Sequence, residues 1–302
     1  PNSPTDRNSN PHCRDCHRPV TRPLSPSGKC FRQKHVDTDT RQLTPEERQS
    51  FRRHGFVINR GLASEETCAG LQDVIHREVG KLGGPIEYEA DLGYPGAPSH
   101  RTDSGGETTR RLQQAIDRHP LFADWATDRD LVACLSCLLG PDLVLPLAHH
   151  NCVMTKQPKY SSRTGWHQDF RYWSFARPEL VSAWLALGPE TAENGSLDLI
   201  PGSHAMTLDS ERFDQQQFFR EDLSTNQDLI DTRQSVTLQR GDVLLFHCLS
   251  LHSAGTNQTD TTKYSVVFTY RSADNPPSPG SRSASLPGIS LAPPPDTSSG
   301  SL

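Results

Sequence analysis

Two residues near the middle of the chain, His167 and Asp169, have the types and the spacing to bind a metal ion. On a strand, residues i and i+2 point to the same face, so an imidazole and a carboxylate would emerge side by side. Such a pair is two thirds of the 2-His-1-carboxylate triad, which holds non-haem Fe(II) and leaves coordination positions open. The pair predicts an iron site only if a later strand supplies a second histidine.

The second histidine has to be chosen from the 13 in the chain. His247 and His252 both stand at the end of an apolar predicted strand, and from the residues alone either could complete the triad. His149 and His150 precede another predicted strand, but nothing in the sequence selects them. His204 lies in a Pro-Gly-Ser-His turn, where a histidine usually orients the backbone.

The elements that would position these residues change in kind after Gly140-Pro141. Before this point helical patterns dominate, and after it the apolar period becomes that of strands. Helices are predicted at 45–54, 64–82, 109–117 and 127–139, and Thr44 with Glu47 predicts a capping box at the start of the first. Strands are predicted at 56–59, 143–148, 151–156, 165–173, 180–187, 196–200, 234–239, 242–248 and 263–271. The order predicts a mainly β fold, a sandwich or jelly roll that carries the N-terminal helices on one side.

The two ends of the chain differ in composition from the middle. Residues 1–40 contain almost no large apolar side chains and residues 275–302 are rich in Pro, Ser and Gly, so both are predicted to be disordered tails around one domain at 41–274. The N-terminal tail carries Cys13 and Cys16, followed by His17, in a C-x-x-C-H pattern that could attach haem or contribute to a zinc site. We interpret it as a polar tail with chance cysteines.

Charge and cysteine usage narrow the class of protein. The net charge of -5 predicts no nucleic-acid partner, and no apolar run reaches the roughly 18 residues of a membrane span, so no membrane partner is expected. The eight cysteines are scattered, which favours a reducing, cytoplasmic location over a disulfide framework. The expected partner is a small-molecule substrate, and the oligomeric state is left open.

Over residues 43–272 the chain resembles the phytanoyl-CoA dioxygenase family of Fe(II)/2-oxoglutarate oxygenases. The motifs that carry the resemblance are Trp166-His167-Gln168-Asp169-x-x-Tyr172-Trp173, Glu193-Asn194-Gly195-Ser196-Leu197, Ile200-Pro201-Gly202-Ser203-His204, and Gly241-Asp242-Val243 through His252-Ser253-x-Gly255-x-Asn257. The resemblance implies a double-stranded β-helix core of the cupin type, with Fe(II), 2-oxoglutarate and O₂ as cofactor and cosubstrates. It also implies His167, Asp169 and His252 as the metal ligands, because the family's distal ligand precedes the Ser-x-Gly-x-Asn turn.

The chain departs from the family where 2-oxoglutarate is anchored. The family's arginine, ten or eleven residues after the distal histidine, is replaced by Lys263. A lysine lacks the planar fork of arginine but can still neutralise a carboxylate, with help from a hydroxyl such as that of Ser265. Arg271, on the same strand face, is the alternative anchor. Gln168 would reach the cosubstrate only through a bulge or a short turn.

The predicted activity is hydroxylation of an unactivated C–H bond of a small carboxylated molecule, an amino acid derivative or a natural-product intermediate. Asp169 argues against a halogenase, in which a small residue frees a site for halide. Desaturation, cyclisation or epimerisation by the same chemistry remains an alternative, as does a non-catalytic jelly-roll protein that binds a metal or ligand. The residues predicted to contact the substrate are Tyr88, Tyr94, Thr102, Arg163, Arg171 and Phe268.

Overall fold

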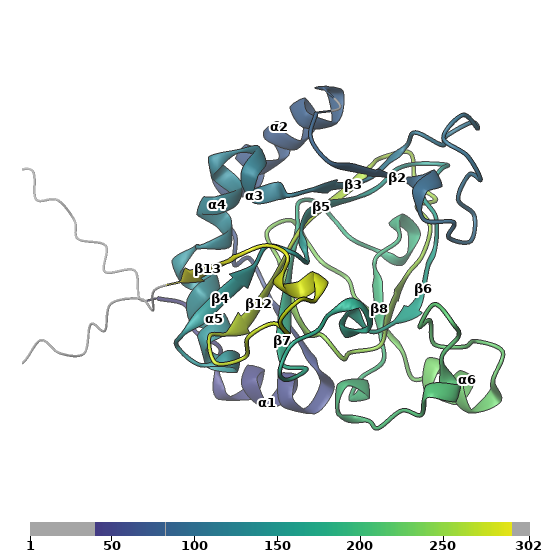
Figure 1. Cartoon of the computed structure of the whole chain (residues 1–302). Coiled ribbons are helices and arrows are strands. Elements are labelled where there is room, and N and C mark those ends of the chain that lie inside the picture. The colour runs from purple at the N-terminus through teal and green to yellow at the C-terminus, as the bar shows by residue number, and fades with distance from the viewer. Residues whose placement is uncertain (1–39, 82, 292–302) are drawn as a thin grey trace, which may run out of the picture. The chain divides into compact units, whose positions relative to one another are not determined.

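The computed structural model describes residues 40–81 and 83–291, which include the predicted domain at 41–274 (Figure 1). The predicted N-terminal tail, with Cys13 and Cys16, lies outside the described residues except at its last position. No helix in the part of the chain that the structure describes is long and apolar enough to cross a membrane.

Six α-helices and thirteen strands are found in residues 40–81 and 83–291. The helices are α1 (Pro45–His54), α2 (Glu65–Lys81), α3 (Ala115–Arg118), α4 (Pro120–Ala126), α5 (Arg129–Leu139) and α6 (Ser224–Ile230). The strands are β1 (Phe56–Asn59), β2 (Ile86–Tyr88), β3 (Thr109–Gln113), β4 (Leu143–Pro146), β5 (Asn151–Lys156), β6 (Thr164–His167), β7 (Leu180–Ala186), β8 (Leu197–Leu199), β9 (Gln234–Ser235), β10 (Val243–His247), β11 (His252–Ala254), β12 (Lys263–Ser272) and β13 (Gly288–Leu291).

The strands form two antiparallel sheets. The larger, nine-stranded sheet has the order β1-β10-β7-β12-β5-β3-β2, and β4 joins it by pairing with β12 and with β13. The smaller sheet has the order β6-β11-β8-β9. In Figure 1 helices α1 to α5 lie on one side of the large sheet, while β6 and β8 of the small sheet lie on the other. The predicted jelly-roll core with helices on one side is confirmed.

Alternation along each strand builds the two cores that this layering requires. Leu185 and Val266 belong to the core shared with the helices. Their neighbours Trp184 and Val267 belong to the core between the two sheets. The face between the sheets is where the polar site residues gather.

Local sequence signals place the helix ends well. In α1 the Thr44 hydroxyl accepts from the Glu47 N–H, and the Glu47 carboxylate accepts from the Thr44 N–H, which is the predicted capping box. The helix ends at Gly55, whose φ is 84°, as glycine allows. The prediction at 109–117 was wrong over its first half. Residues Thr109–Gln113 form β3, because pairing with both β2 and β5 outweighs a weak local preference.

The C-terminal prediction also needs correction. Residues 275–291 were expected to be disordered, yet Asn275 is fully buried and β13 pairs antiparallel with β4. Asn275 accepts a hydrogen bond from the Arg177 N–H and donates to the carbonyl oxygens of Arg177 and Glu179. A Pro- and Ser-rich segment thus gains order from backbone pairing and polar contacts, which composition alone does not reveal.

Candidate metal centre

His167 and His252 meet at the end of a strand pair in the small sheet. They are direct cross-strand partners in β6 and β11, and their ring centroids lie 4.2 Å apart. Ligand atoms of these two histidines and of Asp169 all lie within 4.8 Å of one another. The three residues predicted as metal ligands therefore converge at one point.

Asp169 reaches this point by a route that differs from the prediction. The strand expected at 165–173 ends at His167, and the chain turns into the 3-10 helix η2 (Asp169–Tyr172). The turn brings the Asp169 Oδ1 within 3.9 Å of His167 Nε2 and 3.6 Å of His252 Nε2. The carboxylate is buried, and its approach depends on the turn and not on a shared strand face.

Backbone carbonyls set the tautomers of both histidines. His167 Nδ1 donates to the Gly165 oxygen at 2.8 Å, and His252 Nδ1 donates to the Ser250 oxygen at 3.0 Å. Since a carbonyl can only accept, each Nδ1 carries the proton and each Nε2 keeps its lone pair for a metal. Burial lowers the pKa of His167 well below its usual range, which favours the neutral ring. Two neutral imidazoles and one carboxylate fit Fe(II).

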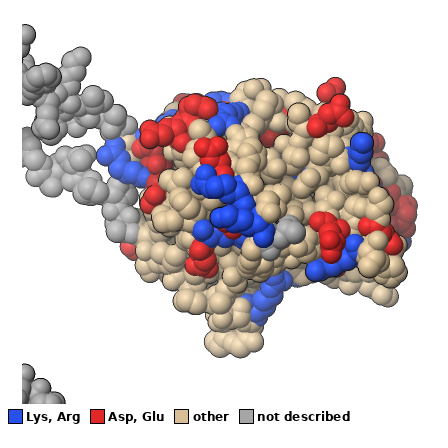
Figure 2. Space-filling view, turned by 90° about the horizontal axis from the view of Figure 1, so that it is seen from above, with Lys and Arg blue, Asp and Glu red and all other residues tan. Residues whose placement is uncertain are grey.

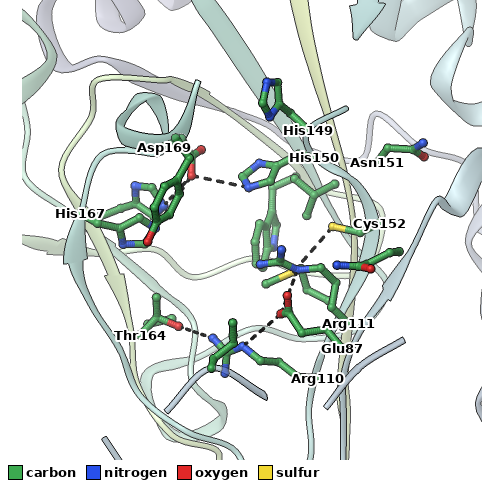
Figure 3. A pocket seen from close by; sticks show the side chains of 18 of the residues that line it. Glu87, Arg110, Arg111, His149, His150, Asn151, Cys152, Thr164, His167 and Asp169 are labelled. Atoms are coloured by element: carbon green, nitrogen blue, oxygen red, sulfur yellow. Dashed lines mark hydrogen bonds and ion pairs between the residues drawn. The ribbon is translucent and has the colours of Figure 1, made fainter. Parts of the chain in front are cut away.

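Two further side chains support the Asp169 carboxylate. The Ser182 hydroxyl donates to Asp169 Oδ2 at 3.4 Å and lies 3.1 Å from the Thr269 hydroxyl. On the other side His150 Nε2 lies 3.6 Å from Asp169 Oδ1, and Figure 3 shows the two side chains facing each other. Sequence reasoning did not select His150, because its position before a strand says nothing about which strand end it would meet.

Two other candidate histidines, His247 and His204, lie elsewhere. His247 Nδ1 accepts from the Leu249 N–H at 3.1 Å, and the His204 ring lies 5.3 Å from that of His247, on the side of the sheet near α1. Neither lines the cavity at the triad. Among the described residues, one group of three metal-binding side chains is found, and His252 is its distal histidine.

The triad opens into a cavity of about 490 Å³ between the two sheets. Figure 3 shows Arg110, Arg111 and Glu87 on the other side of the cavity from His167. Arg110 is held there by its two terminal nitrogens: Nη1 donates to Glu89 and to the Ser162 hydroxyl, and Nη2 donates to the Thr164 hydroxyl. These contacts hold the segment 86–111 against β6 and close one side of the cavity.

Two lysines lie next to each other in the cavity wall. Lys263 and Lys156 are cross-strand partners in β12 and β5, and both are buried. Lys263 Nζ lies 3.0 Å from Glu190 Oε2, while Ser265 and Trp184 donate to Glu190 Oε1. The charge of Lys263 is therefore balanced by a buried carboxylate.

Lys156 has no such partner. Its ammonium donates to the carbonyl oxygens of Ser162 and Gly255, at 2.7 and 2.6 Å, and forms no ion pair with any described residue. Burial lowers the pKa of Lys156 well below its usual range, and the positive charges of Arg110 and Lys263 act in the same direction. An anion beside Lys156 would favour its protonated form and accept its spare N–H, so the position is a ready site for an anion. In the predicted strand 151–156, Lys156 lies four residues after Cys152, so both side chains point to the same face, and both line the cavity. Sequence reasoning missed this signal.

The structure brings together only part of the predicted site. The predicted residues that line the cavity are His167, Asp169, His252, Lys263, Tyr94 and Arg171. The predicted residues that lie outside its lining are Gln168, Ser265, Arg271, Tyr88, Thr102, Arg163 and Phe268.

Each exclusion has a local cause. Phe268 lies in the core shared with the helices, because its place in β12 alternates with the face that carries Lys263. Arg163 pairs with Glu221 at 2.6 Å. Arg271, at the far end of β12, donates to the carbonyl oxygens of residues 272 and 273.

The other four residues are also occupied or distant. Gln168 donates to the Leu249 oxygen at 2.7 Å, and Ser265 is bound to Glu190. Tyr88 stacks under the guanidinium of Arg101. Thr102 lines a separate, more open hollow made by residues 101–108.

Comparison with known proteins agrees with this geometry. The family described as Phytanoyl-CoA dioxygenase matches residues 51–265. The peroxisomal phytanoyl-CoA dioxygenase of Rattus norvegicus is 26% identical over 269 residues, covering 85% of this chain and 76% of the relative. The ectoine dioxygenase of Halomonas elongata is 23% identical over 249 residues, covering 77% of this chain and 71% of the relative.

Solved structures show the same fold. The epimerase SnoN from nogalamycin biosynthesis, in complex with Fe³⁺, alpha ketoglutarate and nogalamycin RO, superposes with a TM-score of 0.64 at 22% identity, covering 82% of this chain and 94% of that one. EctD from S. alaskensis, with 2-oxoglutarate and 5-hydroxyectoine, superposes with a TM-score of 0.62 at 20% identity, covering 80% of each chain.

Proposed function

Because the chain belongs to the phytanoyl-CoA dioxygenase family of Fe(II)- and 2-oxoglutarate-dependent oxygenases, we propose that it hydroxylates an unactivated C–H bond of a small carboxylated molecule. The chain is an enzyme that uses Fe(II), 2-oxoglutarate and O₂. It is therefore not the non-catalytic binding protein that the sequence left open. In the proposed reaction R–H, O₂ and 2-oxoglutarate give R–OH, succinate and CO₂, with one oxygen atom going to each organic product.

One observation carries this proposal: His167, Asp169 and His252 converge at one end of a cavity large enough for a cosubstrate and a substrate. These three residues would hold the iron, His167 and His252 through Nε2 and Asp169 through Oδ1. The bound iron supplies activation of O₂ coupled to decarboxylation of the 2-oxo acid. The protein orients the three ligands through the Gly165, Ser250 and Ser182 contacts described above.

The two lysines form the cosubstrate end. We propose that the far carboxylate of 2-oxoglutarate lies against Lys156 and Lys263, whose strands place them side by side. Together with Glu190 they leave one uncompensated positive charge, and a carboxylate would balance it. Lys156 has the spare donor, whereas Lys263 would have to share its ammonium with Glu190. We expect Lys156 to contribute more of the binding energy.

The chain also controls water and orientation around the reacting carbon. Trp184, Phe246 and Leu197 line the cavity and belong to the apolar core between the sheets, and the Phe246 ring lies 5.1 Å from that of His252. An apolar lining keeps water from the reacting groups and limits side reactions. Epimerisation, desaturation or ring closure would use the same residues, and analysis of the product would distinguish them from hydroxylation.

The proposal is tested by anaerobic titration of the metal-free protein with Fe(II) and then with 2-oxoglutarate. We expect one bound iron per chain, followed by the visible charge-transfer band of a chelated 2-oxo acid. His167→Ala should lose both. Iron binding that is unchanged in His167→Ala would contradict the assigned ligands, and iron binding without the band would contradict the assigned cosubstrate end.

A further inference from the structure

The cavity has one wall that lies beyond the family match. The match ends at residue 265, yet Arg282, Ser285 and Leu286 line the cavity that contains the triad. They belong to the 3-10 helix η6 (Arg282–Ala284) and the turn that follows it, before β13. The metal ligands lie inside the match, so the shared chemistry and this wall come from different parts of the chain.

The C-terminal segment is fixed firmly in place. Ser283 is buried, lies 2.7 Å from His149 Nε2, and accepts from the Ser174 N–H at 2.8 Å. Burial lowers the pKa of His149 to about 3, so its ring is neutral and donates or accepts without a charge. Upstream, the N–H of Ser278 donates to the Ser174 oxygen, and Phe175 pairs with Pro277. The wall is therefore held against the turn that carries Asp169.

The side chains on this wall combine positive charge with apolar surface. The Arg282 guanidinium forms no ion pair or hydrogen bond with any residue that the structure describes, although Arg282 lines the cavity. Leu286 and Tyr172 also line it and are 41% and 50% exposed, so apolar surface is open beside Arg282. Exposed apolar groups beside an unpaired cation suit a ligand with an apolar body and an anionic end.

Arg171, in η2, adds a second guanidinium to the lining of the cavity. It stacks over Phe218 at 4.0 Å and Tyr172 at 4.4 Å, and its Nε is buried without a hydrogen-bond partner. Its remaining contacts are long, 3.4 and 3.3 Å to the carbonyl oxygens of residues 216 and 217. A buried donor without a partner is costly unless a ligand satisfies it.

We propose that the segment 282–286 is the substrate-selecting wall of the enzyme. Arg282 and Arg171 bind the carboxylate of an otherwise apolar small molecule, while Leu286 and Tyr172 contact its apolar body. This inference rests on the proposed function and specifies its substrate class. Figure 2 shows Lys and Arg on one face of the molecule in several separate groups, many of them beside Asp or Glu.

The test uses the complex of the full chain with Fe(II) and 2-oxoglutarate, kept anaerobic. The probes are 3-phenylpropionate and octanoate, each with its primary amide as the uncharged control, and binding is followed by the shift of the charge-transfer band. We expect the carboxylates to bind at least about tenfold more tightly than the amides. Arg282→Gln should weaken carboxylate binding about tenfold and leave amide binding unchanged. The matched control is Arg220→Gln, which removes an exposed guanidinium paired with Asp222 outside the cavity.

The outcomes separate this inference from the proposed function. If no charge-transfer band forms before a probe is added, the assignment of the iron and cosubstrate sites is wrong. If the band forms but carboxylates bind no better than amides, or no probe binds, the carboxylate-selecting wall is wrong. The wall is also wrong if Arg282→Gln binds every probe as the unchanged protein does. Leu286→Gln should weaken binding of both members of each pair, because it removes apolar contact and not charge.

Discussion

The cavity has two polar ends, the iron end at His167, Asp169 and His252 and the lysine end at Lys156, Lys263 and Glu190. Both hold ionisable groups away from water, but they do so in different ways. At the iron end the carboxylate of Asp169 faces the imidazoles of His167 and His252, and no Lys or Arg of the described residues pairs with it, so the site is short of positive charge. At the lysine end Lys156 and Lys263 face the single carboxylate of Glu190, so the site has positive charge to spare. The charge at each end is unbalanced, and the proposed ligand would balance it. That ligand is a divalent cation at the iron end and a carboxylate at the lysine end.

The difference also concerns stability. Hydrogen bonds to the Gly165 and Ser250 oxygens fix the Nδ1 proton of each histidine without a metal. The lysine end depends on its internal ion pair between Lys263 and Glu190. We therefore expect substitutions at the iron end to change ligand binding alone. Substitutions at the lysine end should change either ligand binding or the free energy of unfolding, depending on the residue.

The largest effect is expected from His252→Ala. Removal of one ligand should weaken Fe(II) binding more than 100-fold, because even partners that only orient a ligand cost about 10- to 100-fold. The measurement is iron stoichiometry and affinity of the purified protein. His247→Ala is the matched control, since that histidine precedes His252 by five residues and lies outside the cavity. Equal iron loss in both variants would contradict the choice of His252.

Lys263→Met should lower the free energy of unfolding by about 3 kcal/mol, because it leaves the buried carboxylate of Glu190 without its cation. Urea unfolding of the metal-free protein measures this. The double variant Lys263→Met with Glu190→Leu should recover most of the loss, since it removes both charges. A single variant as stable as the unchanged protein would mean that the ion pair does not hold this end together.

Lys156→Met should act mainly on the cosubstrate. We expect 2-oxoglutarate to bind about 10- to 100-fold more weakly, the range for loss of a charge-assisted hydrogen bond. The unfolding free energy should fall less than in Lys263→Met, because no carboxylate is left unpaired. The dissociation constant comes from the anaerobic charge-transfer titration. If Lys263→Met weakens binding of 2-oxoglutarate more than Lys156→Met does, then Lys263 and not Lys156 contributes more of the binding energy.

The smallest effect is expected from Ser182→Ala, which removes the hydroxyl beside Asp169 Oδ2. The contact is long, so we expect Fe(II) affinity to fall about tenfold, at the low end for a residue that orients a ligand. Stability of the metal-free protein should change little. An unchanged iron affinity would show that the turn in η2 alone fixes the carboxylate.

By itself the sequence determined the features that depend on neighbouring residues and on strand order. The capping box at Thr44, the alternation that separates the two cores, and the three candidate metal ligands could all be predicted, because short spacings and linked motifs carry them. The fold class followed from the change of period after Gly140.

Only the tertiary structure decided the rest. A single backbone turn brings in Asp169. The pairing of Lys156 with Lys263 and the position of residues 282–286 at the cavity both join segments that are far apart in the chain. The register between β5 and β12 made Lys156 a neighbour of Lys263, and alternation in β12 placed Phe268 with the helices. Such positions are set by long-range pairing and burial, whose energies outweigh the local preferences that a sequence displays.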